Sequence, residues 1–418
     1  MTELFAGSWA VAALLHVWAH PASAGFTAAP TWTGLVHVLL AFAALAVLLS
    51  PGRRDRLVVL CGLQVLSAAM ELPRLGNHWL LAALVSAAVV TTRDFAAPAR
   101  LVLLTAYSFM AFSKLNTGFL DPAVSCGRFF ADELGSSYGL PTPGTGAVPY
   151  LTAAVECAIP VLLLVRRTRA AGVLLGLAFH GLISLDRTHL FTDFSAVLYA
   201  LFPLFLAGVP DRRPRTLLAA AGLLVGFGLW TFPGEWARSA GLLWWLVAAV
   251  PVAAAAVRHR APAALGRPHR GLMVLPVLAL LNGLTPYLEV KTAFGWNMYA
   301  NLRTVAGRSN HLLVPATLPL SGAQRHLVEV ISSGDPALGE YAATGYLLAV
   351  PQLRAYARIR PGSDLTYRLD GAEHHASRLA GDPVLGRPLP WWRERLLPLR
   401  AVDPGPGPRC QSGWGAAG

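Results

Sequence analysis

The chain has 418 residues, of which 55% are hydrophobic and only 13% are charged, and its formal net charge is +12. Soluble domains carry about 25% charged residues, so this composition places the chain in the membrane class. The arginines stand in short clusters between apolar runs. This pattern favours membrane orientation over nucleic-acid binding as the reason for the positive charge. No basic segment opens the chain, so we expect no cleavable signal peptide.

Eleven apolar runs follow one another through the first two thirds of the chain. We therefore predict an all-α polytopic membrane bundle of about nine to eleven transmembrane helices over residues 1–288. Several runs are shorter than the ~20 residues that a perpendicular span needs, which sets the uncertainty of this number. The runs lie at 4–18, 33–50, 57–71, 78–92, 99–115, 148–165, 170–185, 194–209, 216–232, 239–257 and 271–288.

The loops between these runs predict an orientation. Five Arg-rich loops each follow an even-numbered run, so they lie on one side, which is the cytoplasm by the positive-inside rule. They are "PGRRDR" (51–56), "TRDFAAPAR" (92–100), "VRRTR" (165–169), "PDRRPR" (210–215) and "RHRAPAALGRPHR" (258–270). We predict a multi-pass protein of a bacterial plasma membrane, with its N-terminus in the cytoplasm and its C-terminal domain outside.

We predict that the C-terminal residues 289–418 form a small extracytoplasmic α+β domain. "RHLVEVISSG" (325–334) and "DLTYRLDG" (364–371) are typical of strands that end near turns. "PQLRAYARI" (351–359) predicts a short amphipathic helix between them. We expect "EHHASR" (373–378) to be a solvated loop.

Polar residues in the apolar runs gather at the ends that this orientation places outside the cytoplasm. Ionisable groups in a span are costly and usually face a cavity or one another, so their one-sided distribution predicts a polar cavity. For any single residue, the alternative is a helix-end side chain that extends to the headgroups. We predict no metal site, because no HxxxH or HxxE motif pairs the histidines. The residues are His16, His20, His37, Glu71, Arg74, Asn77, His78, Lys114, Asn116, Glu156, His180, Asp186, His189 and Asp193.

Lysine is almost absent from this chain. Of the 34 Lys and Arg residues, only Lys114 and Lys291 are lysines. Arginine stays protonated in proteins, whereas a desolvated lysine can lose its proton near neutral pH. Lys114 therefore stands where a general base would be useful, and the alternative is a lysine kept by chance at a helix end. Anchoring at the membrane surface suffices for Lys291.

Two further features leave alternatives open. Glu156 can hydrogen-bond Lys114 or His180, or it can be a structural carboxyl paired with an arginine or the backbone. Trp296 and Arg303 lie in "WNMYANLR" (296–303), which can form a lid or bind a peptide carboxylate. The sequence favours an aromatic anchor at headgroup depth for this segment.

Two of the four cysteines, Cys126 and Cys410, fall on the side that we place outside the cytoplasm. A disulfide between them is a hypothesis that suits an oxidising compartment. The other two, Cys61 and Cys157, lie inside apolar runs, where we expect them to pack as small hydrophobic residues.

Four segments together resemble one family. "GNHWLLAAL" (76–84) and "FSKLNTGFL" (112–120) are similar to the Asn-His and Lys-Leu-Asp/Asn motifs of the vitamin K-dependent γ-carboxylases and the wider bacterial HTTM (horizontally transferred transmembrane) family. Residues 156–205 resemble the family's Glu, Pro, basic-turn, Phe-His and Phe-Ser signature. "AFGWNMYANLRTVAGRSNHLLVP" (293–315) resembles the segment that opens its extracytoplasmic part. The resemblance covers roughly residues 5–315.

The resemblance implies a reaction. Lys114 would deprotonate a reduced quinone of the vitamin K hydroquinone type, with His78 and His180 in the same active region. Oxygen would add, the resulting alkoxide would take a proton from a peptide Glu, and CO₂ would capture the carbanion. Asn116 stands where the animal enzymes have Asp, and the C-terminal part is shorter than theirs.

The implied partners are membrane lipid and a secreted peptide or protein, without nucleic acid. The alternative function is that of a non-carboxylating HTTM protein that matures, binds or exports a secreted peptide.

Overall fold

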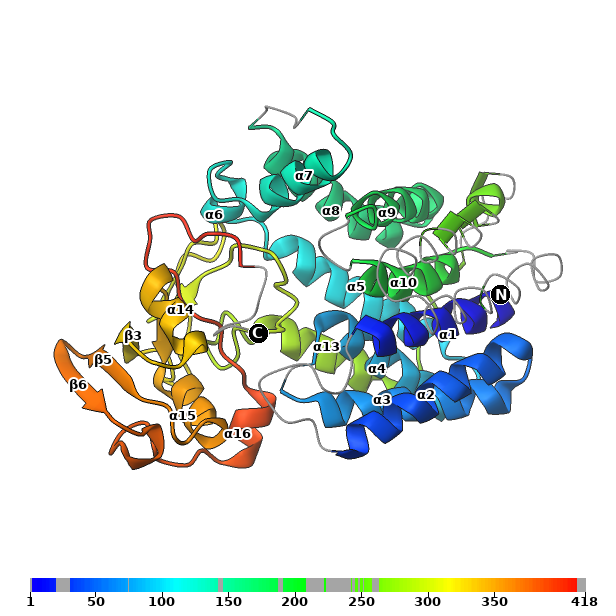
Figure 1. Cartoon of the computed structure of the whole chain (residues 1–418). Coiled ribbons are helices and arrows are strands. Elements are labelled where there is room, and N and C mark those ends of the chain that lie inside the picture. Colours follow the sequence, from blue (N-terminus) through cyan, green and yellow to red (C-terminus); the bar gives the residue numbers. More distant parts are fainter. Residues whose placement is uncertain are drawn as a thin grey trace.

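The computed structural model describes most of the chain (Figure 1). The described ranges are 2–19, 31–73, 75–141, 146–186, 191–207 and 263–411, with residues 222, 242, 245–246, 249–250 and 252–257 between the last two. Helices dominate up to residue 284, and strands begin at residue 304.

The first half of the helical part forms a continuous series of helices. They are α1 (Thr2–Ala19), α2 (Thr31–Leu49), α3 (Arg54–Glu71), α4 (Asn77–Thr91), α5 (Ala96–Phe112), α6 (Thr117–Leu120) and α7 (Cys126–Ser137). The later ones are α8 (Val148–Leu164), α9 (Arg169–Ile183), α10 (Thr192–Leu201) and α13 (Val274–Leu284), with short 3₁₀ turns at Arg166–Thr168, Phe202–Phe205 and Arg270–Met273.

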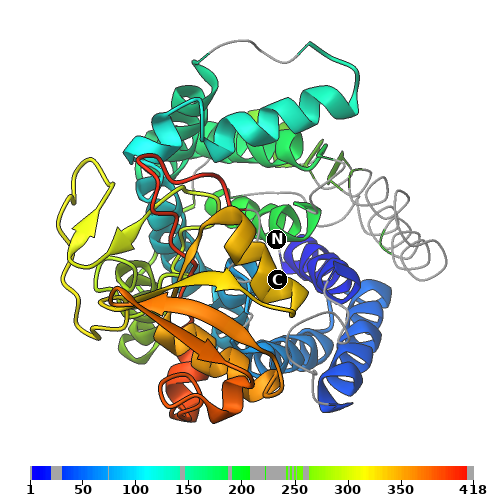
Figure 2. The ribbon, with the colours of Figure 1, turned by 60° about the vertical axis from the view of Figure 1, so that its left-hand side comes forward.

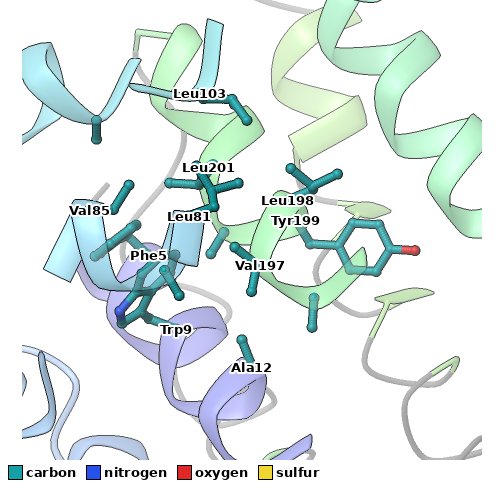
Figure 3. Close-up of a cluster of buried hydrophobic side chains, with 14 of the residues drawn as sticks. Phe5, Trp9, Ala12, Leu81, Val85, Leu103, Val197, Leu198, Tyr199 and Leu201 are labelled. Carbon is teal, nitrogen blue, oxygen red and sulfur yellow. The ribbon is translucent and has the colours of Figure 1, made fainter. Parts of the chain in front are cut away.

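The helical core is built around α1, α4, α5 and α10. Figure 3 shows apolar side chains from these four helices converging between them. Phe5 and Trp9 stack with ring centroids 5.0 Å apart, and Trp9 Nε1 donates a hydrogen bond to Ser86 Oγ at 3.1 Å. Complete burial of two or more large side chains per helix fixes the faces that these helices turn toward one another.

The predicted bundle of nine to eleven transmembrane helices is wrong. Among the described residues, only α2, through its segment Trp32–Leu49, is long and apolar enough to cross a membrane by length and composition. A second candidate arises only if α8 and α9, which meet at a bend of 116°, are counted as one broken span.

The physical reason is helix length. Helices α4, α5, α10 and α13 contain 15, 17, 10 and 11 residues, which is below the ~20 that a span needs. The apolar runs of α4, α5 and α10 are continuous because most of their side chains are buried against neighbouring helices. Helix α13 differs, because it buries only four of its eleven residues and leaves several aliphatic side chains exposed. The run predicted at 216–232, apart from residue 222, and parts of the run at 239–257 lie outside the described residues. The orientation and the membrane localisation stay predictions.

The C-terminal part contains an antiparallel sheet of four strands in the order β4-β3-β5-β6. The strands are β3 (Leu327–Ser332), β4 (Leu347–Ala349), β5 (Leu365–Leu369) and β6 (Ala372–Ala376). Helices α14 (Pro336–Thr344), α15 (Val350–Ile359) and α16 (Trp391–Leu396) accompany them, with a 3₁₀ turn at Leu379–Gly381. A separate pair, β1 (Thr304–Val305) and β2 (Arg308–Ser309), precedes the sheet.

The structure confirms the strands predicted within 325–334 and 364–371 and the helix predicted at 351–359. Their apolar faces form a second core, in which Val328, Leu353 and Tyr367 are buried. The loop predicted at 373–378 is wrong, because β6 pairs with β5 through most of this segment. The Asp370-Gly371 turn between them has positive φ at both residues, which is the hairpin signal that the prediction overlooked.

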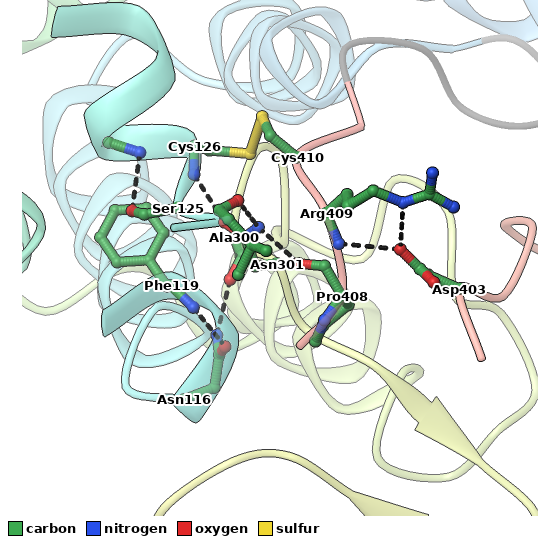
Figure 4. The surroundings of a disulfide bond; sticks show 12 residues. Asn116, Phe119, Ser125, Cys126, Ala300, Asn301, Asp403, Pro408, Arg409 and Cys410 are labelled. Atoms are coloured by element: carbon green, nitrogen blue, oxygen red, sulfur yellow. Dashed lines mark hydrogen bonds and ion pairs between the residues drawn. A yellow bond between two sulfur atoms is a disulfide. The ribbon is translucent and has the colours of Figure 1, made fainter. Parts of the chain in front are cut away.

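The end of the chain returns to the helical part. Figure 2 shows the red C-terminal segment running from the sheet region toward the cyan helices. There Cys410 forms a disulfide with Cys126, the first residue of α7, with the two Cα atoms 4.8 Å apart (Figure 4). The predicted disulfide is confirmed. It closes a loop of 284 residues and fastens the last described residues beside α6 and α7.

Candidate functional site

A cavity of about 230 Å³ lies between α5, α7, α8, α9 and the start of α10. It is many times the ~30 Å³ share of one water molecule. Most of its wall is aromatic or aliphatic, and a few polar groups converge on it, as in small-molecule pockets. The polar members are Tyr107, Lys114, Thr152, Glu156, His180, Asp186 and Tyr299, and the aromatic ones include Phe119, Phe130, Phe179, Phe191 and Phe194.

Lys114 and Glu156 meet in the wall of this cavity. Lys114 Nζ lies 2.7 Å from Glu156 Oε2 and donates a longer hydrogen bond of 3.4 Å to the carbonyl of Met110. Both side chains are largely buried, with 9% and 12% of their surfaces exposed. Of the alternatives for Glu156, the structure confirms the contact with Lys114. Removing either partner of an ion pair so shielded from water would leave an uncompensated buried group, so the two side chains depend on each other.

His180 contributes a second polar group to the same cavity. Its Nε2 shares a hydrogen bond of 2.9 Å with the Tyr107 hydroxyl. Its Nδ1 is buried and has no hydrogen-bond partner among the described residues. Burial disfavours a charged imidazole. The structure thus brings together Lys114, Glu156 and His180, three of the residues that the sequence predicted.

His78 belongs to a different polar cluster. Its Nε2 lies 3.1 Å from Asp193 Oδ2 and 3.4 Å from His16 Nδ1, and it does not line the cavity. Asn77, beside it at the start of α4, is also buried and also absent from the cavity wall. The ring of Phe194 lies between the two histidines, with its centroid 6.4 Å from that of His78 and 5.4 Å from that of His180.

Asn116 supports the turn after Lys114 without lining the cavity. It caps α6 by accepting a hydrogen bond of 2.8 Å from the amide of Phe119. Its Nδ2 donates to the carbonyls of Ser113 and Ala300 at 2.7 and 2.6 Å, as the dashed lines to Phe119 and Ala300 in Figure 4 show in part. The Nδ2 of Asn310 donates to its side-chain oxygen at 3.0 Å. A fully buried amide therefore has both its donors and its acceptor satisfied.

Trp296 and Arg303 have structural contacts outside the cavity. Trp296 is completely buried, and its Nε1 donates to the carbonyl of Ala279 at 2.7 Å, so it does not lie exposed as a surface anchor. Arg303 donates to the backbone carbonyls of Asp403 and Gly405. From this segment, Met298 and Tyr299 reach the cavity instead.

Sequence reasoning missed three polar cavity residues, of which Tyr107 and Tyr299 are aromatic and the third is Thr152. Tyr107 stands inside an apolar run, and Tyr299 stands in a segment that we interpreted as a surface anchor. No spacing in the sequence distinguishes them from aromatic packing residues. A positive φ at Tyr299 reflects the irregular backbone that turns this ring inward.

The second lysine, Lys291, lies apart from the cavity. Its Nζ donates to Asn282 Oδ1 at 2.7 Å, and Asn282 Nδ2 donates to the carbonyl of Phe294 at 2.9 Å. Burial lowers the pKa of Lys291 to about 8. No acidic partner for Lys291 is found among the described residues, in contrast to Lys114.

No family model matches this chain, and neither a curated protein nor a solved structure does. The resemblance to the γ-carboxylases and HTTM proteins therefore stays a prediction, and the chemistry has to be argued from the site.

Replacing Asn116 by Asp tests whether the amide is required. An aspartate cannot donate to the carbonyls of Ser113 and Ala300, and it places a charge in a buried position. We expect Asn116→Asp to lower the free energy of unfolding by about 2–4 kcal/mol at pH 7. Burial raises the pKa of such a carboxyl, so the loss should shrink as the pH falls and the group becomes neutral. Denaturant unfolding at pH 7 and pH 4.5 measures both, and equal stability of the variant and wild type at pH 7 would contradict the assignment.

Replacing one partner of the Lys114–Glu156 pair should lower the free energy of unfolding more than replacing both partners. Lys114→Met or Glu156→Gln leaves one buried charged group without its partner. We expect each variant to have a free energy of unfolding about 3–5 kcal/mol below that of the wild type. The double variant Lys114→Met/Glu156→Gln, which combines the two single changes, should recover most of this loss in the free energy of unfolding. The exposed pair of Arg368 and Glu329 provides the control, because disrupting it should cost less than about 1 kcal/mol. Additive losses in the cavity pair would show that the two groups are not coupled.

The lowered pKa of Lys291 predicts a dependence of stability on pH. Between about pH 8 and the ordinary lysine value of 10.5, the unfolded chain holds a proton that the folded chain has released. Wild-type stability should therefore rise relative to Lys291→Met between pH 7.5 and pH 9.5. The rise should stay below the ~1.4 kcal/mol per pH unit of one full proton, since Lys291 is partly exposed. Paired melting curves measure this difference, and a flat difference would refute the shift.

Proposed function

We propose that the cavity binds a reduced quinone and that Lys114 and Glu156 together remove a proton from one of its hydroxyl groups. The observation that carries this proposal is the 2.7 Å contact between the two side chains in the wall of a mostly apolar cavity. The aromatic wall suits a flat ring, and the few polar groups can orient its hydroxyls. The reaction expected from the family resemblance thus has a candidate base and a candidate binding site in one place.

The Lys114–Glu156 pair can become a base when the ligand binds. An apolar ring displaces water, and water loss raises the cost of keeping separate charges on amine and carboxyl. Moving the shared proton to Glu156 then leaves a neutral amine on Lys114, which can accept the proton of the quinol hydroxyl. The resulting ammonium stabilises the quinol anion. The hydrogen bond between His180 and Tyr107 supplies a second polar contact for the ring.

The later steps of the proposed reaction come from the resemblance. Oxygen adds to the quinol anion, and the alkoxide that results takes a γ-proton from a peptide Glu. CO₂ captures the carbanion, and the products that leave are quinone epoxide and water, which carries the second oxygen atom and the proton taken from Glu. A carbanion has to be protected from water, and the aromatic wall of the cavity serves this need.

We extend the proposal to a place at a membrane, where a quinone dissolves. Support comes from the outer face of α2, on which large apolar side chains are exposed. Trp32, Phe42 and Leu49 have 67%, 63% and 62% of their surfaces accessible. An apolar face of this kind is typical of a membrane or protein contact.

The same ion pair supports an alternative function. If the pair of Lys114 and Glu156 is purely structural, the cavity holds a lipid or part of a secreted peptide without chemistry. The protein would then be a non-carboxylating protein that matures, binds or exports a peptide. The observation that favours this alternative is the 2.7 Å contact between Lys114 and Glu156, in which the two charges neutralise each other.

Lys114→Arg separates the two functions. Arginine keeps the positive charge but cannot lose its proton, so it can replace a structural lysine but not a base. We expect quinone epoxide formation from a naphthoquinol to fall by about 10²–10⁴-fold in this variant. Purified protein, a reduced naphthoquinone, labelled bicarbonate and a Glu-containing peptide provide the assay, with epoxide measured by chromatography and carboxylation by incorporated label.

Lys291→Arg is the matched control, because it makes the same substitution outside the cavity and should leave turnover unchanged. Equilibrium dialysis of the oxidised naphthoquinone checks that Lys114→Arg still binds the ring. Turnover equal to that of wild type in Lys114→Arg would refute the proposed base. Ring binding by the wild type without any epoxide would support the alternative function.

A further inference from the structure

A second polar cluster lies at the ends of the first three helices. His16 comes from the last turn of α1, His37 from the second turn of α2, and Glu71 is the last residue of α3. Their ligand-type atoms lie within 4.8 Å of one another. Because each residue comes from a different helix, no short sequence motif could reveal this cluster, and the sequence predicted no metal site.

The distances within the cluster fit a shared metal ion. Glu71 Oε1 lies 3.1 Å from the Nε2 of His16 and 3.1 Å from the Nε2 of His37. In a tetrahedral zinc site, bond lengths of about 2.0–2.2 Å place neighbouring ligand atoms ~3.3 Å apart. The side chains are thus already near the positions that coordination requires.

The surroundings hold His16 in one orientation. The indole of Trp79 stacks on its ring, with centroids 3.6 Å apart and planes inclined by 6°. On the far side of the ring, Nδ1 lies 3.4 Å from His78 Nε2, which in turn lies 3.1 Å from a carboxylate oxygen of Asp193. Metal-binding histidines are typically supported in this way, with the nitrogen that does not bind the metal in contact with a polar group.

The cluster is enclosed but can be reached. His16 and His37 are 2% and 5% exposed, whereas the Glu71 side chain retains 13% of its surface. Imidazole and carboxylate ligands suit zinc and its neighbours rather than calcium or magnesium. Without a metal, Glu71 would be satisfied by the two histidines and by the Ser67 hydroxyl, which is the competing explanation.

We propose that His16, His37 and Glu71 bind one Zn²⁺ ion. Three protein ligands leave one coordination position for water or another small ligand. The ion would join the ends of α1, α2 and α3, and it stands apart from the cavity and from the function proposed for it.

The test is a metal titration of the full-length purified protein. After dialysis against EDTA, calorimetry with Zn²⁺ should show one equivalent bound, and Co²⁺ should give the intense visible bands of a tetrahedral site. His37→Gln and Glu71→Gln should each weaken binding by at least about tenfold. His326→Gln, at an exposed histidine paired with Asp370, is the matched control and should bind as the wild type does.

A second measurement guards against variants that fail to fold. Zn²⁺ should raise the melting temperature of the wild type and of His326→Gln, but not that of Glu71→Gln, since a ligand that binds only the folded state stabilises it. Circular dichroism checks that the metal-free variants keep their helices. Absence of a stoichiometric Zn²⁺ site in the wild type, or unchanged binding in both ligand variants, would overturn the proposal in favour of a hydrogen-bonded cluster alone.

Discussion

The cavity depends on one buried amide, that of Asn116. The chain leaves α5 just before this residue, and the carbonyls of Ser113 and Ala300 are then left without helical partners. Asn116 donates to both and caps α6 with its oxygen, so one side chain satisfies three backbone groups. Unsatisfied groups of this kind are costly in a protein interior, and their pairing fixes the direction in which the chain continues. The positions of α6, α7 and the disulfide beside them follow from this turn.

In this arrangement, one side chain supplies the hydrogen bonds to the backbone and another supplies the negative charge beside Lys114, whereas a single carboxylate could do both. An aspartate at position 116 would bring a charge close to Lys114, whereas asparagine brings hydrogen bonds without charge. The balancing charge comes instead from Glu156 on α8, 2.7 Å from the amine. The departure from the Lys-Leu-Asp pattern therefore does not leave Lys114 without a partner. This ion pair joins the end of α5 to α8, so it depends on the packing of these two helices against each other.

Sequence patterns predicted what is local and failed where packing decides. The rarity of lysine singled out Lys114, and strand and helix periodicity placed β3, β5 and α15. An apolar run, however, reports burial and not the length of the helix that forms, so the expected spans became short helices around a common core. The family resemblance placed His78 in the active region of Lys114, whereas in the structure His78 contacts Asp193 and does not line the cavity. The turn at Asp370 and Gly371 did carry a readable signal for β6.

Phe194 explains why the two polar clusters remain distinct although they share the same helical core. Its ring contacts His180 on one side and His78 on the other, and it also forms part of the cavity wall. The next residue back, Asp193, holds His78 from the same helix turn. A displacement of His78 would therefore move α10 at the point where it borders the cavity. The histidine cluster therefore packs against the cavity wall through Phe194 and is tied to the same helix through the contact of His78 with Asp193.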